Sequence, residues 1–177
     1  MKLLPERNAN RPGDDPIFAL NREATQRRAA GEKVINATVG ALLEDDGSLA
    51  VLPTVTEVLR EVPAAKAAGY APISGVPEFL HEVTRDLLGG TSLAEQCVSV
   101  STPGGTGALR HAAAAFLDHH QSLVTSSFYW GPYATICDEN ERKLVTFPMF
   151  DDAGGFHVAA FARALDETAR AQGRLLV

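Results

Sequence analysis

The spacing of apolar residues changes along the chain between a helical repeat and short runs rich in β-branched residues. Apolar positions three or four residues apart predict helices over residues 16–30, 53–61, 75–88, 108–118, 132–140 and 158–171. Short apolar runs predict strands over residues 33–37, 97–100, 123–125, 143–147 and 174–177. Strands and helices alternate from residue 97 onward, which is typical of a parallel sheet with helices on both faces.

Turn-forming residues separate these elements. Pro16 and Pro53 stand where helices begin, since the first turn of a helix does not need their missing amide hydrogen. Asp45-Asp46 lies in a Glu-Asp-Asp-Gly turn, so we interpret the pair as turn residues rather than as a catalytic pair of carboxylates. The first dozen residues, which contain several Pro and Asn, are expected to form an extended arm.

Composition narrows the class of protein. The 177 residues are 45% hydrophobic and 21% charged, which is typical of a globular domain, and no run of 18 apolar residues predicts a transmembrane helix. Sixteen basic residues against 22 acidic ones give a net charge of −6, which argues against nucleic acid as a partner. The two cysteines and five histidines lack metal-ligand spacing. We therefore expect a cytoplasmic α/β protein that binds a small molecule, without a membrane or a metal.

The segment Pro103-Gly-Gly-Thr-Gly107 lies between a predicted strand and a predicted helix. Glycines let backbone amides approach an anion closely, and a helix N-terminus carries a partial positive charge. The amides of Gly105, Thr106 and Gly107 could therefore hold a phosphate. The segment lacks the lysine of a P-loop and the spacing of a dinucleotide fingerprint. The alternative is a glycine-rich turn that serves only strand–helix packing.

Three further residues are candidates for a ligand site. Trp130 follows the predicted strand over residues 123–125, and ligands of parallel sheets bind at the carboxyl ends of strands. Its indole could stack on a flat cofactor, or it could simply fill the core. Tyr70 lies in a Gly/Pro-rich loop and could reach a ligand or pack locally. Gly40 could mark a close backbone approach or a plain turn.

Four segments, in this order, resemble the class I/II aminotransferases, in the aspartate/aromatic branch of the pyridoxal 5'-phosphate (PLP) enzymes of fold type I. They are Ile35–Gly40 (INATVG), Glu44–Pro53 (EDDGSLAVLP), Tyr70–Phe79 (YAPISGVPEF) and Thr102–Arg110 (TPGGTGALR), followed by Trp130. The resemblance covers residues from about Pro16 to Val177. It implies a three-layer α/β/α fold with a mostly parallel sheet: residues 44–177 would form an incomplete large domain, and residues 1–43 an N-terminal arm and small-domain segment.

The same resemblance implies roles for single residues. Gly105 and Thr106 would bind the PLP phosphate, and Trp130 would stack on the pyridine ring. Tyr70 would reach the phosphate bound to the neighbouring subunit, which implies a homodimer with shared active sites. Gly40 would lie near the carboxylate of the substrate, which would be an amino acid or a 2-oxo acid.

The resemblance also implies what the chain lacks. The family's Schiff-base lysine and its carboxylate-binding arginine would lie beyond Val177, and no lysine of the chain (Lys2, Lys33, Lys66 and Lys143) matches the family position. None of the 177 residues is therefore assigned as catalytic, and we expect the chain to be the inactive N-terminal portion of a transaminase.

Two alternatives to an aminotransferase stay open at this stage. The chain could be a truncated, non-catalytic fragment that binds a phosphate-bearing ligand or dimerises. It could also be a nucleotide-binding module that uses Pro103–Gly107, although the missing phosphate-binding fingerprints disfavour this.

Overall fold

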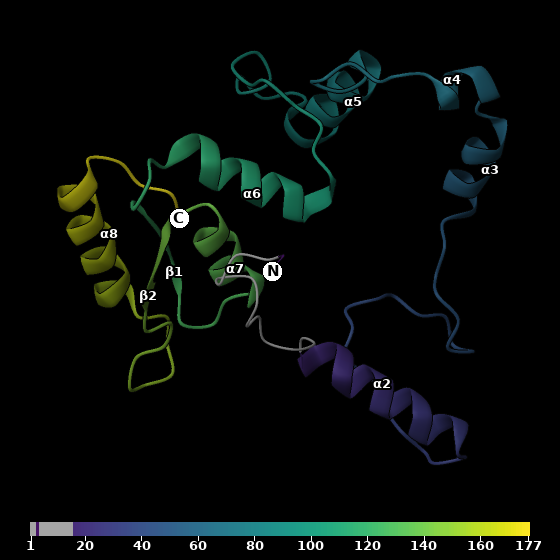
Figure 1. Cartoon of the computed structure of the whole chain (residues 1–177), viewed down its shortest axis with the longest axis horizontal. Coiled ribbons are helices and arrows are strands. Elements are labelled where there is room, and N and C mark those ends of the chain that lie inside the picture. The colour runs from purple at the N-terminus through teal and green to yellow at the C-terminus, as the bar shows by residue number, and fades with distance from the viewer. Residues whose placement is uncertain (1–2, 4–15) are drawn as a thin grey trace. The chain divides into compact units, whose positions relative to one another are not determined.

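The computed structural model describes Leu3 and residues 16–177, and the chain divides into two compact units, Met1–Gly69 and Tyr70–Val177 (Figure 1). The expected arm over the first dozen residues lies, except for Leu3, outside the described residues. The expected domain boundary between residues 43 and 44 stays a prediction. Each compact unit is described below by itself.

The first unit contains three helices among its described residues: α2 (Pro16–Ala29), α3 (Pro53–Glu61) and α4 (Ala64–Ala68). Proline occupies the first position of α3, as predicted, and the bounds of this helix match the prediction. Gly31 follows α2 with a φ of 87°, a left-handed conformation that favours glycine. The short helix α4 was not predicted, because its five residues carry no apolar repeat.

A tight turn joins Leu43 and Leu49, which form an isolated antiparallel bridge. Asp46 accepts a hydrogen bond from the amide of Ser48 at 2.8 Å, and Gly47 has a φ of 82°. Hydrogen bonds from the side chain and backbone of Ser48 hold the pKa of Asp46 below its usual value. The interpretation of this acidic pair as turn residues is confirmed.

The second unit carries a small parallel sheet. Its elements in order are α5 (Pro77–Leu88), α6 (Gly104–Phe116), β1 (Ser122–Ser126), α7 (Pro132–Glu139), β2 (Lys143–Phe147) and α8 (Val158–Gln172). The strands β1 and β2 pair in parallel, from Ser122 opposite Lys143 to Ser126 opposite Phe147. A parallel pair requires a crossover connection, which α7 supplies.

The two faces of β1 contact different helices, as the period of two in a strand requires. Val124 lies in the core with Phe147 of β2 and with Ala160 and Ala164 of α8. Its neighbours Leu123 and Thr125 instead line a cavity with residues of α6 and α7. Figure 1 shows α8 on one side of the strands and α7 on the other. The predicted three-layer α/β/α arrangement is therefore confirmed for this part of the fold.

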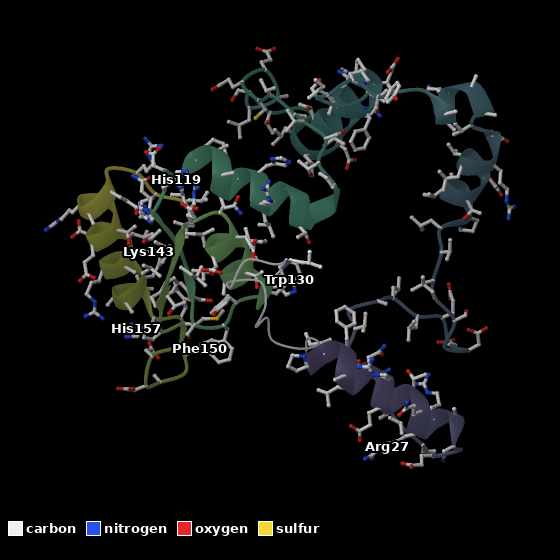
Figure 2. All side chains as sticks on the ribbon, viewed as in Figure 1. Arg27, His119, Trp130, Lys143, Phe150 and His157 are labelled. Carbon is white, nitrogen blue, oxygen red and sulfur yellow. The ribbon has the colours of Figure 1, made fainter. Side chains whose placement is uncertain are left out.

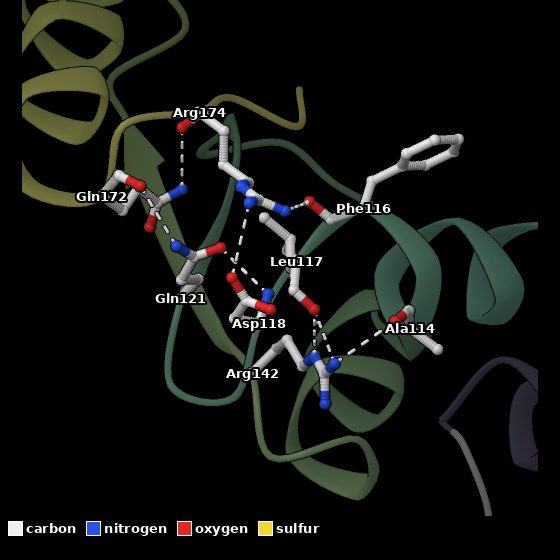
Figure 3. Close-up of polar contacts among 8 residues, drawn as sticks. All are labelled: Ala114, Phe116, Leu117, Asp118, Gln121, Arg142, Gln172 and Arg174. Atoms are coloured by element: carbon white, nitrogen blue, oxygen red, sulfur yellow. Dashed lines mark hydrogen bonds and ion pairs between the residues drawn. The ribbon is translucent and has the colours of Figure 1, made fainter.

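Polar side chains fix the edge of the sheet where both strands begin (Figure 3). Arg142 donates hydrogen bonds to the carbonyls of Leu117 at 2.6 Å and Ala114 at 3.3 Å, which lie at the end of α6. Gln172 accepts from the amide of Ser122 at 2.7 Å and donates to its carbonyl at 3.0 Å. The side-chain amide of Gln172 thereby pairs with both backbone hydrogen-bonding groups of Ser122, as the backbone of a neighbouring strand would.

Three predicted strands are not regular strands in the structure. Residues 33–37 and 97–100 have no regular secondary structure and pair with no other strand among the described residues. Residues 174–177 lie beside β1, where the Leu176 carbonyl accepts a hydrogen bond from the Val124 amide at 2.9 Å. That single bond does not make them a regular strand. Apolar β-branched sequence favours extension, but a strand requires a partner.

No helix within residues 16–177 is long and apolar enough to cross a membrane.

The two cysteines offer a test of the core. Cys97 is exposed, whereas Cys137 on α7 is 1% exposed and burial raises the pKa of its thiol. We expect Cys137 to react with a disulfide reagent at least roughly tenfold more slowly than Cys97, since it must wait for local opening. Stopped-flow thiol titration measures both rates, and a Cys97→Ser variant isolates the slow phase. Equal rates in the native chain would show that α7 does not cover the sheet.

Candidate functional site

The glycine-rich segment forms the start of α6. Gly104 has a φ of 68°, and its amide donates to the Thr102 carbonyl at 2.7 Å. The N-cap residue Pro103 makes no side-chain hydrogen bond to the helix. Amides in the first turn of a helix have no partner within the helix, so those of Gly105 and Thr106 remain available to an anion.

Two glycines of this segment differ in what surrounds them. A Cβ at Gly107 would lie 2.6 Å from Cδ of Pro103, so packing requires glycine there. A Cβ at Gly105 would meet nothing within 4 Å. Packing therefore explains Gly107, as the alternative interpretation of this segment holds, but it does not explain Gly105. The open space beside Gly105 is what the approach of a phosphate requires.

Trp130 lies between the end of β1 and the start of α7. Its side chain is 46% exposed, so the indole does not fill the core of the described residues. The rings of Trp130 and Tyr133 meet edge to face, with centroids 6.0 Å apart and planes at 89°. Tyr129 stacks on Tyr133 at 6.4 Å. The half-exposed indole can offer one face to a flat ring.

The two ends of the sheet differ in what they carry (Figure 2). His119 lies near Lys143, the first residue of β2, whereas Phe150 and His157 lie beyond the other end of that strand. His119 pairs with Glu141 at 2.9 Å, and Nδ1 of His157 accepts from the Ala160 amide at 3.3 Å as the N-cap of α8. Both histidines thus have structural partners. Within residues 16–177 no group of His, Cys, Asp and Glu could hold a metal ion.

An apolar cavity of about 270 Å³ lies between α6, α7 and β1. Its lining includes Leu109 and Ala112 of α6 and Tyr133 and Ile136 of α7, so the two helices present successive turns to each other. Because α7 returns antiparallel to β1 and α6 leads into the start of β1, the helices run in the same direction.

Gly105 and Thr106 lie in the first turn of α6. Trp130 lies between the end of β1 and the start of α7, at the edge of the sheet where β1 ends. This is the edge at which ligands of parallel sheets bind.

The other two candidate residues are not brought to this site by the structure. Tyr70 begins the second unit and is fully exposed, at 106% of the reference area. Gly40 lies in the first unit, where a Cβ would meet nothing within 4 Å. Their predicted roles toward a cofactor and a substrate stay predictions.

Sequence reasoning did not predict the contact between Tyr133 and Trp130. Tyr133 follows Trp130 by three residues and stands next to Pro132, which starts α7. Residues three apart across a helix start meet on one face, so the spacing carried a signal for this contact.

The family model of aminotransferases of class I and II matches residues 32–177. The mitochondrial aspartate aminotransferase of Schizosaccharomyces pombe is 28% identical over 144 residues, which are 78% of this chain and 32% of that protein. The cytoplasmic aspartate aminotransferase of Gallus gallus is 36% identical over 107 residues, which are 58% of this chain and 26% of that protein.

A solved structure of an aminotransferase from Anaerococcus prevotii has a similar fold. It matches 99% of this chain with a TM-score of 0.85 and 34% sequence identity, and the match covers 43% of that structure. The chain thus spans about a quarter to less than half of the length of these relatives.

The contrast between the two glycines predicts opposite effects on stability. Gly107→Ala should lower the free energy of unfolding by about 1–3 kcal/mol, because its Cβ would overlap the Pro103 ring. Gly105→Ala should raise it by up to about 1 kcal/mol, because alanine favours the helix and has room. Denaturant unfolding followed by circular dichroism measures both. Equal destabilisation would mean that packing requires both glycines.

Proposed function

The chain belongs to the class I and II aminotransferases, and on this premise we propose that it supplies the N-terminal part of a PLP-dependent aminotransferase of fold type I. The reaction would transfer an amino group between an amino acid and a 2-oxo acid. The observation that carries the proposal is the uncapped turn at the start of α6 with open space beside Gly105, and the half-exposed Trp130 after β1 supports it.

The start of α6 has the properties that a phosphate site needs. The uncapped first turn leaves the Gly105 and Thr106 amides available, and the Thr106 hydroxyl adds a donor beside them. The space beside Gly105 admits an oxygen atom at van der Waals distance. The residues present therefore fit a phosphate group, and Gly105 and Thr106 would hold that of PLP.

Trp130 would hold the ring of the cofactor. Its exposed indole face can stack on a pyridine ring and keep water from that face. PLP, when bound, supplies an electron sink for the substrate's α-carbon. The part of this chain would be to bind and orient the cofactor from its phosphate and from one ring face.

Two residues extend the proposal beyond the described contacts. We assign Tyr70 to the phosphate site of a neighbouring subunit, since its fully exposed phenol can reach another chain. This gives a homodimer with shared active sites. We assign Gly40, which has open space around it, to the neighbourhood of the substrate carboxylate.

Catalysis would require residues that this chain lacks. None of its four lysines matches the position of the family's cofactor-binding lysine, so we expect the 177 residues to bind the cofactor without turning over substrate. We extend the proposal to the cytoplasm, which is the location that the chicken relative's name states for that protein. Residues 44–177 would form part of the large domain, and residues 1–43 the arm and small-domain segment.

A charge substitution at Gly105 tests the phosphate site without disturbing the fold. Gly105→Asp places a carboxylate in open space in the first turn of α6, where an acid stabilises a helix. The same carboxylate would repel a phosphate, so we expect binding to weaken at least roughly tenfold. The probe is pyridoxamine 5'-phosphate, because it has no aldehyde to react with surface lysines. Equilibrium dialysis gives its Kd.

Gly105→Asn is the matched control, since it has nearly the same size and no charge. We expect the Asn variant to bind more tightly than the Asp variant, and the difference to shrink as salt is raised. Equal affinities of the Asp and Asn variants would contradict a phosphate at this turn. Failure of the unmodified chain to take up the probe would contradict the proposed function.

A further inference from the structure

Trp130 is half-exposed and has one ring contact among the described residues. The indole is 46% exposed, and among residues 16–177 the ring of Tyr133 is the one aromatic ring in contact with it. The residue that follows is Gly131, around whose Cβ position nothing lies within 4 Å. A half-exposed side chain keeps freedom about its χ angles unless a contact restrains it.

Tyr133 is itself firmly placed. It lies in the first turn of α7, and its amide donates to the Trp130 carbonyl at 2.9 Å, which fixes the backbone between the two residues. Its ring lines the cavity with Leu109 of α6 and Thr125 of β1 and stacks on Tyr129. Tyr133 is less exposed than Trp130 and lines a cavity together with residues of α6 and β1.

The contact between the two rings has a defined direction. An angle of 89° at a centroid distance of 6.0 Å is the edge-to-face geometry that aromatic quadrupoles favour. Such a contact restrains the plane of the indole as well as its position, which an aliphatic neighbour would not do. The orientation of the indole is then set by a ring that lines the cavity between the sheet and the two helices.

We propose that Tyr133 is a positioning residue that fixes the plane of Trp130 through this edge-to-face contact. The consequence for cofactor affinity rests on the proposed function, whereas the restraint on the indole does not. Without it, the indole would populate several rotamers, and a flat ligand ring would have to select one of them. The aromatic ring of Tyr133 is the required feature, and its hydroxyl is not.

Fluorescence of the chain tests the restraint directly, because Trp130 is its only tryptophan. Tyr133→Leu should lower the emission anisotropy of Trp130 and raise its quenching by acrylamide, and Tyr133→Phe should leave both as in the unmodified chain. The affinity for pyridoxamine 5'-phosphate should fall roughly 2- to 12-fold in the Leu variant, the factor that one aromatic pair contributes. Phe128→Leu is the matched control, because Phe128 contacts Phe150 and belongs to the same segment.

Circular dichroism checks the fold of each variant, and Tyr133→Met replaces the Leu variant if the latter does not fold, since methionine fills the space without a ring. Unchanged anisotropy and quenching in the Leu or Met variant would overturn the proposal and leave Tyr133 as core packing. So would a Phe variant as mobile as the Leu variant. If no form of the chain binds the probe while the fluorescence changes as expected, the proposed function fails and the positioning role stands.

Discussion

The parallel pairing of β1 with β2 is the constraint on which the site depends. It obliges α7 to run back across the sheet, so that α7 starts where the strands end and its first turn follows Trp130 directly. The helix α6 packs beside α7, and both helices line one cavity. Arg142, which binds the carbonyls at the end of α6, holds that helix at the edge where the strands begin. One backbone pairing thus decides at which end of the sheet Trp130 lies.

Several apolar side chains outside the sheet are exposed, because no other described residue covers them. Ile35 and Ile73 are almost wholly exposed, and so is Val98 in a segment predicted as a strand. Large exposed apolar areas are typical of surfaces that other protein covers. The chain spans less than half of the length of its relatives, and the whole protein's activity, substrates and dimerisation are accordingly proposals.

Local sequence patterns predicted most of the helices and strands. Whether the remaining apolar runs form strands depends on tertiary contacts. Proline at the first position and apolar spacing gave the bounds of α3, and β-branched runs gave both strands of the sheet. Residues 97–100 have the composition of a strand but no described neighbour, since composition cannot supply a partner. Gly105 and Trp130 were predicted from glycine chemistry and strand order. The contact of Tyr133 with Trp130 was not predicted, because it forms only when α7 packs on the sheet.

The central claim is that the start of α6 and Trp130 serve one ligand, and fluorescence titration tests it most directly. Pyridoxamine 5'-phosphate added to the chain should quench the emission of its only tryptophan in a saturable manner. Inorganic phosphate should compete with that quenching, and pyridoxamine without a phosphate should quench only weakly. This result would require the phosphate and the ring to bind at the same place. Quenching that phosphate does not relieve, or none at all, would contradict the account.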